Sequence, residues 1–318
     1  DGRVGEMLVT HEGIEKVADN MGEVKPTLML SVPRLYEKMH AGVIDKVNAG
    51  SSLKQKIFYW SLEIGRKVSE YNLTNKKIPG LLKFQHKIAS KLAFSKIHER
   101  VGGRLRFFIS GGAPLAQEIG EFFSSAGIQI MEGYGLTETS PVLTTNLPYQ
   151  FRFGTVGKPI TGVEIKIADD GEILAKGPNI MQGYYNDPES TNNVLSKDGW
   201  FSTGDIGEFE DGFLKITDRK KNIWVTSGGK NVAPAPLENS LATSPYIDQV
   251  IVIGHSKNFI SALIVPNFEI VIKYLSSINK SLSGNEAIIE HKDVIELINI
   301  EVKNAMKNFS NYEKVKVF

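Results

Sequence analysis

The 318-residue chain contains no cysteine, so disulfide bonds, thiolate catalysis and cysteine-ligated zinc are excluded. Net charge is nearly absent too, because 37 basic and 36 acidic side chains leave a formal charge of +1. No global field therefore recruits nucleic acid. The six histidines are scattered, and no two stand at the spacing of zinc ligands.

Long hydrophobic runs are also missing. No apolar segment approaches the ~20 residues of a membrane-spanning helix, and the first residues show no signal-peptide pattern. The sequence therefore predicts a cytoplasmic protein. The length allows two domains, each with a buried core.

Residues 34–103 have few turn signals and predict helices. Between residues 46 and 100, twelve Lys and Arg stand against three Glu, so the net charge is twelve minus three, or +9. Two stripes at helical spacing lie in this stretch, one apolar (Leu81, Phe84, Ile88, Leu92) and one basic (Lys83, Lys87, Lys91). A basic amphipathic stretch can make weak contact with an anionic membrane surface. We prefer the alternative of an ordinary solvated face, because no tryptophan flanks the basic stripe.

Residues 104–135 change to an α/β rhythm. "RLRFFIS" and "IQIMEGYG" predict strands, and between them "LAQEIGEFFSSAG" predicts a helix with Pro114 at its start and Gly127 beyond its end. This is one βαβ unit. Because ligands of such sheets bind beyond the carboxyl ends of the strands, the glycine clusters at both strand ends are candidate binding loops.

Antiparallel hairpins follow. Asp-Gly turns inside "VEIKIADDGEILAKG" and "GEFEDGFLKI" predict two hairpins within residues 154–217, and hence a small β-barrel or curved sheet. A glycine loop, two strands in "DQVIVIGHSKNFISALIVP" and a helix at 286–309 predict a separate α+β unit. The expected fold is α/β with an α+β second domain: a large domain at 1–217, a charged hinge at 218–222 and a small domain at 223–318.

The run "GYGLTE", residues 133–138, combines an aromatic ring between glycines with a hydroxyl and a carboxylate. A flat ring can stack on a planar base, Thr137 can donate to a phosphate oxygen, and Glu138 can hold a hard divalent cation. These features suit a nucleotide with Mg²⁺. On its own, a Gly-Tyr-Gly loop is as often a simple turn.

Three further stretches decide between these interpretations: "ISGGAPL" (109–115), "WFSTGDIG" (200–207) and "DRKKNIWVTSGGKN" (218–231). In this order, the combination resembles the adenylate-forming superfamily, which includes acyl-CoA synthetases, firefly luciferase and the adenylation domains of peptide synthetases. Within it, "KPTLMLSVPRLYEKM" and the long helical insertion before "GGRLRFFISGGAPL" resemble the long-chain fatty acyl-CoA synthetases. The resemblance covers nearly the whole chain.

The resemblance implies roles for particular residues. Gly111, Gly112 and Ala113 would line the adenine site, Tyr134 would stack on the base, Thr137 would bind phosphate, Glu138 would bind Mg²⁺, Asp205 and Arg219 would hold the ribose hydroxyls, Lys221 would be the hinge residue, and the loop around Gly229 would meet coenzyme A. Taken singly, each has a bland alternative, such as a capped turn or a surface ion pair. The implied substrates are a fatty acid, ATP and coenzyme A, and AMP and pyrophosphate are released.

Two family features are missing. The phosphate loop of the family is expected upstream of residue 1, and its C-terminal lysine is expected beyond Phe318. We therefore expect an internal fragment with part of the large domain, the hinge and most of the small domain, inactive by itself. The alternatives are a nucleotide-binding or scaffolding fragment without turnover, and a ligase of the same superfamily for other carboxylic acids.

Overall fold

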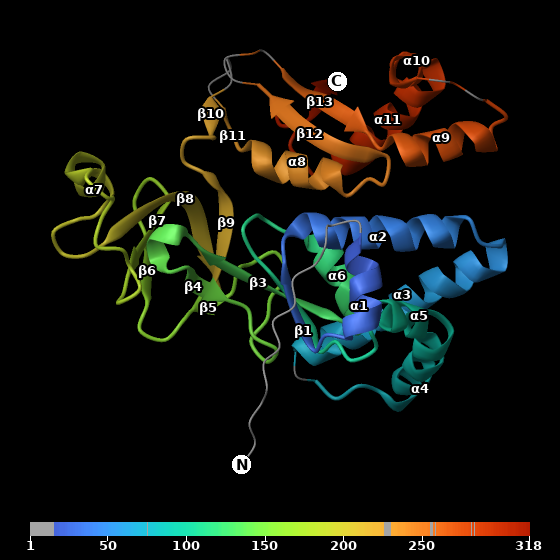
Figure 1. Cartoon of the computed structure of the whole chain (residues 1–318), viewed down its shortest axis with the longest axis horizontal. Helices are drawn as coiled ribbons and strands as arrows, with labels where there is room; N and C mark the ends of the chain where they lie inside the picture. The colour runs from blue at the N-terminus through green and yellow to red at the C-terminus, as the bar shows by residue number, and fades with distance from the viewer. Residues whose placement is uncertain are drawn as a thin grey trace.

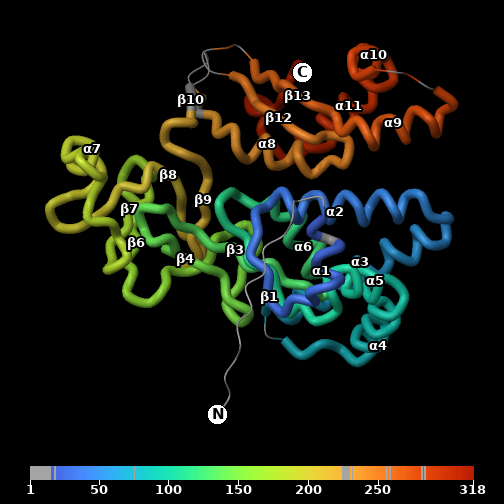
Figure 2. The backbone as a smooth tube through the Cα atoms, viewed as in Figure 1, coloured from blue at the N-terminus to red at the C-terminus, as the bar shows by residue number. Residues whose placement is uncertain are grey.

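The computed structural model describes residues 16–74, 76–225, 230–254, 257, 259–280, 282 and 284–318. Three hydrophobic cores organise this part of the chain. Figure 1 shows a helix-rich unit in blue to green, a strand-rich unit in green to yellow beside it, and a third unit in orange to red above both. The backbone passes from the second unit to the third after β9, as the tube in Figure 2 shows.

The helices are α1 (Val17–Val24), α2 (Pro33–Asn48), α3 (Ser52–Leu73), α4 (Gly80–Ala89), α5 (Ser95–Arg100), α6 (Gln117–Ser125), α7 (Pro188–Val194), α8 (Pro234–Ala242), α9 (Phe268–Ser277), α10 (Asn285–Ile289) and α11 (Lys292–Ala305). A π-helical turn (Ser90–Phe94) joins α4 to α5, and a 3₁₀ turn covers Thr137–Thr139. The strands are β1 (Leu28–Ser31), β2 (Phe107–Ser110), β3 (Gln129–Gly135), β4 (Val142–Thr145), β5 (Lys158–Pro159), β6 (Glu164–Ile167), β7 (Glu172–Lys176), β8 (Phe201–Glu210), β9 (Phe213–Arg219), β10 (Trp224–Val225), β11 (Asn231–Val232), β12 (Ile247–Ile253), β13 (Ile260–Pro266) and β14 (Val315–Val317).

The first unit is built on a five-stranded sheet of order β1-β2-β3-β4-β5. β1, β2 and β3 are parallel, and α6 crosses over from β2 to β3, so the predicted βαβ unit is confirmed. Gly127 follows α6 with a φ of +82°, as a helix-ending glycine does. The expected position of Pro114 is wrong, because α6 begins only at Gln117 and Pro114 lies in the preceding loop.

Helices fill most of residues 33–100, as predicted. Pro33 starts α2, where its missing N–H costs no hydrogen bond. The buried hydroxyl of Tyr36 donates to the carbonyl of Ile109 at 2.7 Å and so joins α2 to β2. Of the predicted apolar stripe, all four side chains are exposed, from 38% for Ile88 to 71% for Leu81, so this face does not pack on the core.

The second unit is the four-stranded antiparallel sheet β6-β7-β8-β9. No pairing joins β6 to β9 among the described residues, so this is an open half-barrel. The β8–β9 hairpin turns at Asp211 and Gly212, whose φ angles of +50° and +80° suit a two-residue turn of the I′ class. Both predicted hairpins are confirmed.

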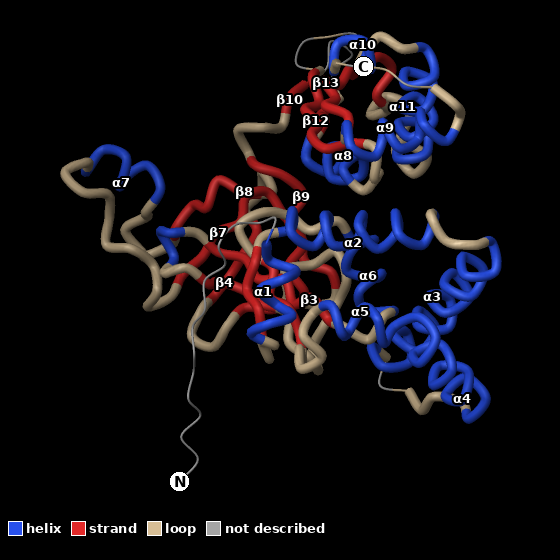
Figure 3. Tube along the Cα trace, turned by 45° about the vertical axis from the view of Figure 1, so that its right-hand side comes forward, coloured by secondary structure: helices blue, strands red, loops and turns tan. Residues whose placement is uncertain are grey.

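The third unit joins β12, β13 and β14 in one sheet, packed with α8, α9, α10 and α11 around a single core. The single helix predicted at 286–309 is wrong, because α10 ends at Ile289 and α11 begins at Lys292. The ring of His291 accepts a hydrogen bond from the amide of Asp293 and caps α11 there. Figure 3 shows the helices of the first unit gathered beside the strands.

Contacts join the third unit to the first. Arg34 on α2 lies 3.2 Å from Asp248 on β12, and Lys273 on α9 lies 2.9 Å from Asp45 on α2. Within the described ranges, no helix combines the length and apolar character needed to cross a membrane.

Candidate nucleotide site

The carboxyl ends of β2 and β3 lie side by side. A Cβ added to Gly111 would lie 3.8 Å from the carbonyl oxygen of Gly133, so the two backbones approach closely. Gly112 has a φ of +83°, a conformation that favours glycine, and both it and Ala113 are exposed. The predicted adenine loop is therefore an accessible stretch of backbone beside the "GYG" strand end.

Tyr134, Asp205 and Arg219 form one cluster. The Tyr134 hydroxyl donates to Oδ2 of Asp205 at 2.7 Å, and Nε of Arg219 lies 3.4 Å from Oδ1. Asp205 and Arg219 face each other across the β8–β9 pair, which explains their proximity at a sequence separation of fourteen. The structure thus brings together three residues that the sequence analysis had placed at one nucleotide.

Burial dominates the electrostatics of this cluster. It raises the pKa of Asp205, while the hydrogen bond from Tyr134 and the charge of Arg219 lower it in part. Burial and the neighbouring Asp205 carboxylate also raise the pKa of the Tyr134 hydroxyl. Tyr134 is only 9% exposed, and its ring packs in the half-barrel core. Its predicted stacking on a base remains a prediction.

The turn after β3 is shaped by Gly135 and Thr139. A Cβ on Gly135 would lie 1.6 Å from the carbonyl oxygen of Pro141, so no other residue fits there. The buried Thr139 hydroxyl accepts from the amide of Leu136 at 2.9 Å and so folds the 3₁₀ turn. As a result Thr137 is exposed and Glu138 is half-buried at the start of this turn.

Glu138 is held from a distant loop. The Tyr184 hydroxyl donates to Oε1 of Glu138 at 3.0 Å, and the amide of Met181 donates to its carbonyl at 2.8 Å. Asn179 in the same loop donates to the carbonyls of Thr139 and Val142 at 2.8 and 2.9 Å. The sequence analysis missed these supports, because nothing local in sequence links residues 179–184 to the "LTE" turn.

Glu132 is a second residue that the sequence analysis missed. It lies in β3 directly opposite Ser110 at the end of β2, and only 8% of it is exposed. Burial raises the pKa of its carboxyl to about 8, although the backbone amide of Leu115 lowers it in part. Among the described residues the Ser110 hydroxyl, also buried, has no hydrogen-bond partner. A buried carboxylic acid and an unsatisfied hydroxyl thus lie behind the Gly111 loop.

The predicted hinge, residues 218–222, includes Arg219 of the Tyr134–Asp205–Arg219 cluster. The Lys220 side chain lies 2.6 Å from Asp170 and 2.8 Å from Glu172, and its amide donates to the carbonyl of Gly204. Lys221 is exposed in the turn that follows. Lys220 of the predicted hinge is therefore anchored to the half-barrel, and the amides of Asn222 and Ile223 donate to the carbonyl of Arg219, which closes the turn around Lys221. Gly229 lies outside the described residues.

Buried Asp218 adds a contact toward the third unit. Burial raises the pKa of its carboxyl, and the backbone amides of Arg219 and of Ala235 in α8 lower it in part.

Searched over the ranges that the structure describes, the chain contains no group of three or more residues suited to hold a metal ion. A Mg²⁺ ion held by Glu138 would therefore depend on a single carboxylate and on the phosphates of its ligand, which is a common mode for this ion.

Comparison with known proteins decides the family. Residues 5–185 match the AMP-binding enzyme family, and residues 221–315 match the AMP-binding enzyme C-terminal domain. The chain belongs to the AMP-binding enzyme family. A long-chain-fatty-acid–CoA ligase of Mycobacterium bovis is 38% identical over 308 residues, which are 96% of this chain and 50% of that protein. The fatty acyl-CoA synthetase A of Dictyostelium discoideum is 33% identical, over 95% of this chain and 47% of its own length.

Solved structures confirm the fold class. The adenylation domain of a carboxylate reductase from Mycobacterium chelonae superposes with a TM-score of 0.68 at 23% identity, over 98% of this chain and 43% of that one. The anthranilate CoA ligase AuaEII, solved with anthranoyl-AMP, gives a TM-score of 0.64 at 18% identity, over 99% and 50%. The chain thus spans about half the length of the relatives that it matches, and its fold is part of an adenylation domain with its C-terminal unit.

Proposed function

We propose that the full-length protein activates long-chain fatty acids in two half-reactions. The fatty carboxylate attacks the α-phosphorus of ATP and expels pyrophosphate, which leaves an acyl-adenylate. The thiol of coenzyme A then attacks the acyl carbon and expels AMP, which leaves the thioester. The relatives named as long-chain fatty-acid–CoA ligases support this substrate class.

One observation carries the proposal. Asp205 is buried and held between the Tyr134 hydroxyl and Arg219, and Tyr134 directly follows Gly133, whose carbonyl oxygen lies close to the accessible Gly111 loop. A carboxylate fixed in this way suits the two hydroxyls of a ribose, and bare backbone suits the edge of adenine. In this proposal Thr137 binds phosphate, and Glu138 binds a Mg²⁺ ion that neutralises charge on the pyrophosphate.

The role of Asp205 in ATP binding can be tested directly in the full-length protein. We expect Asp205→Ala to raise the KM for ATP by more than about tenfold, since a charge-assisted hydrogen bond contributes about 1.5–3 kcal/mol. The KM for the fatty acid should change little. Asp169→Ala is the matched control, because Asp169 is exposed in the β6–β7 turn. An unchanged KM for ATP in Asp205→Ala would make Asp205 a structural residue.

The identity of the acid is tested in the same assay. We expect ATP–pyrophosphate exchange to depend on fatty acids of long chain and to be weak with short or aryl acids. Preference for an aryl acid would favour a ligase of the kind that AuaEII represents, whose fold this chain shares. ATP binding without exchange for any of the acids would instead favour a nucleotide-binding module without turnover.

A location in the cytoplasm is part of this proposal, and weak contact of residues 46–100 with an anionic membrane is the alternative to the ordinary solvated face preferred from the sequence. The exposure of Leu81, Phe84 and Leu92 beside the lysines of α4 supports the contact. Sedimentation with vesicles containing an anionic lipid tests it. Equal sedimentation with neutral vesicles would contradict the electrostatic part.

A further inference from the structure

A large cavity lies among the helices of the first unit, away from the candidate nucleotide site. It encloses about 850 Å³ and is bounded by α2, α3, the π-helical turn, α5 and α6. No residue of the "GGA" loop, the "GYGLTE" turn, β8 or β9 is among those that line it. Figures 1 and 3 show these helices on one side of the parallel strands and the half-barrel on the other.

The floor of this cavity is apolar. Leu35, Phe58, Ile97 and Phe123 line it and are themselves no more than 7% exposed. Met39, Val43 and Val47 on α2 line it as well. The volume lies within the ~300–1,000 Å³ that small-molecule sites usually enclose. The floor therefore suits an alkyl chain, which would gain from removal of its surface from water.

The rim has the opposite character. No acidic residue lines any part of the cavity. Five exposed cationic residues line its opening: Lys38, Lys46, Lys54, Lys96 and Arg100. None of the five forms an ion pair with another residue in the part of the chain that the structure describes. Unmatched positive charge around an apolar cavity is complementary to an anionic head group on an apolar chain.

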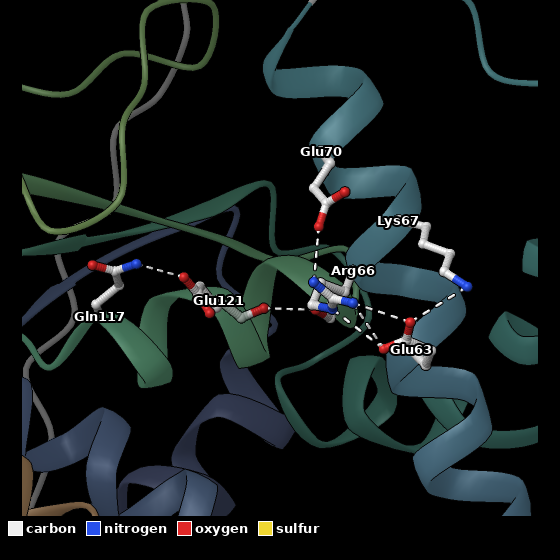
Figure 4. A network of polar contacts seen from close by, with 7 residues as sticks. Glu63, Arg66, Lys67, Glu70, Gln117 and Glu121 are labelled. Carbon is white, nitrogen blue, oxygen red and sulfur yellow. Dashed lines mark hydrogen bonds and ion pairs between the residues drawn. The ribbon is translucent and has the colours of Figure 1, made fainter. Parts of the chain in front are cut away.

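Two other cations of α3, Arg66 and Lys67, are matched by acids. On α3, Arg66 lies 3.0 Å from both Glu63 and Glu70, and Lys67 lies 3.4 Å from Glu63, as Figure 4 shows. The hydrogen bond from Arg66 lowers the pKa of Glu63. Lys54 lies near the start of α3 and lines the cavity, and it forms no ion pair with an acidic residue in the described part of the chain. The five rim cations therefore belong to a wider basic surface, which also includes exposed Lys56 on α3, and they are its members that line the cavity.

We propose that this cavity is a binding site for a single-chain amphipathic anion, that is, a long alkyl chain ending in a carboxylate or a phosphate-bearing head group. The chain lies on the apolar floor, and the head group meets the five rim cations. The cavity shares no lining residue with the candidate nucleotide site. The proposal therefore stands on the cavity alone.

Gly42 gives a precise way to close the site. It lies on α2 among the lining residues, and a Cβ there would meet nothing within 4 Å. Gly42→Leu therefore adds an alkyl side chain at the cavity wall, where its Cβ has room, and it also favours the helix. The matched control is Gly22→Leu on α1, where a Cβ likewise meets nothing within 4 Å but which does not line the cavity.

The test is equilibrium titration of the full-length protein with cis-parinaric acid, whose fluorescence reports binding. We expect Gly42→Leu to remove one bound probe per protein, or to weaken it at least about tenfold, and Gly22→Leu to change nothing. Displacement by palmitate and by palmitoyl-CoA distinguishes a carboxylate head from a phosphate-bearing one. Displacement by hexadecyltrimethylammonium that is as strong as by palmitate overturns the proposal, because the rim would then select no anion.

A charge variant keeps the test independent of cavity filling. We expect Lys46→Glu combined with Lys96→Glu to weaken the probe at least about fivefold, more at low salt. Lys83→Glu combined with Lys87→Glu on α4 is the control, since neither residue lines the cavity. ATP–pyrophosphate exchange should persist in Gly42→Leu. If Gly42→Leu lost exchange and probe binding together, the cavity would be part of the path of the substrate, and the proposal of a separate site would be overturned. If neither the wild type nor any variant showed exchange, only the proposed function would be contradicted.

Discussion

The Tyr134 hydroxyl donates a 2.7 Å hydrogen bond to Oδ2 of Asp205, and the two residues are 71 positions apart. Tyr134 belongs to β3 of the parallel sheet and Asp205 to β8 of the half-barrel, so this bond joins two units. Arg219 lies 3.4 Å from the other carboxylate oxygen. Asp205 is therefore oriented by the protein itself, which lowers the ordering cost for any ligand that it binds.

Tyr134→Phe tests this relationship. The variant removes the donor and leaves a buried carboxylate with one hydrogen bond fewer, so we expect the free energy of unfolding to fall by about 1.5–3 kcal/mol. Urea unfolding measures the change. Tyr185→Phe is the control, because Tyr185 is 93% exposed. Equal stability of the two variants would show that the hydrogen bond contributes nothing net.

Gly135→Ala tests the turn that presents Thr137 and Glu138. The added Cβ would lie 1.6 Å from the Pro141 carbonyl oxygen, so the turn must rearrange and we expect ATP binding to be lost. Gly133→Ala is the matched control in the same strand, because its Cβ would meet its nearest atom at 3.6 Å. Nucleotide titration by calorimetry compares the two. Retained binding in Gly135→Ala would remove the turn from the site.

Glu132→Gln tests the buried carboxyl behind the loop. Since the folded-state pKa is raised from 4.5 to about 8, the folded protein keeps a proton that the unfolded chain loses at lower pH. The wild type therefore loses stability as pH rises from about 4.5 to about 8, by up to about 1.4 kcal/mol per pH unit. We expect the stability of Glu132→Gln relative to the wild type to increase across this window and to level off above it.

Urea unfolding at a series of pH values measures that difference. Glu118→Gln on α6 is the control, because it makes the same chemical change at an exposed position of the same unit. A flat difference between Glu132→Gln and the wild type would mean that Glu132 ionises as freely in the folded protein as in the unfolded chain.

Local pattern predicted much of this fold. The Asp211-Gly212 turn has the φ angles that its sequence requires, and the strand–helix–strand order of residues 107–135 follows from turn residues and periodicity. The break between α10 and α11 was not predictable from the hydrophobic period, which continues across it. It depends on His291, whose ring caps the second helix. A cap of this kind is a rare use of histidine and has no pattern that signals it.

The candidate site also has features that local sequence predicts and features that it does not. Asp205 and Arg219 are neighbours because a hairpin pairs them, so their proximity follows from the hairpin register. The support of Glu138 by Tyr184 depends on a loop 46 residues away, and the high pKa of Glu132 depends on burial at the junction of two strands. Both depend on tertiary packing, which a single sequence does not encode in its local periodicity.

Lys221→Pro tests the hinge. Lys220 is anchored to Asp170, Glu172 and the carbonyl of Gly204, so we expect a rotation of the third unit to begin after it, in the turn around Lys221. Lys221 is exposed in the following turn, and among the described contacts its amide makes no backbone hydrogen bond, so proline removes none. Proline fixes φ near −65° and favours one arrangement of the two parts. We expect adenylate formation to survive in the full-length protein while thioester formation slows at least about tenfold, a barrier rise of only ~1.4 kcal/mol.

ATP–pyrophosphate exchange and single-turnover acyl transfer on the same preparation separate the two half-reactions. Lys221→Ala is the control, because it removes the charge and leaves φ free. If alanine slows transfer as much as proline does, the charge of Lys221 matters and its backbone does not. Equal losses of both half-reactions in Lys221→Pro, or no loss in either, would place the pivot elsewhere, because a residue whose φ must change between two states cannot be fixed without favouring one of them.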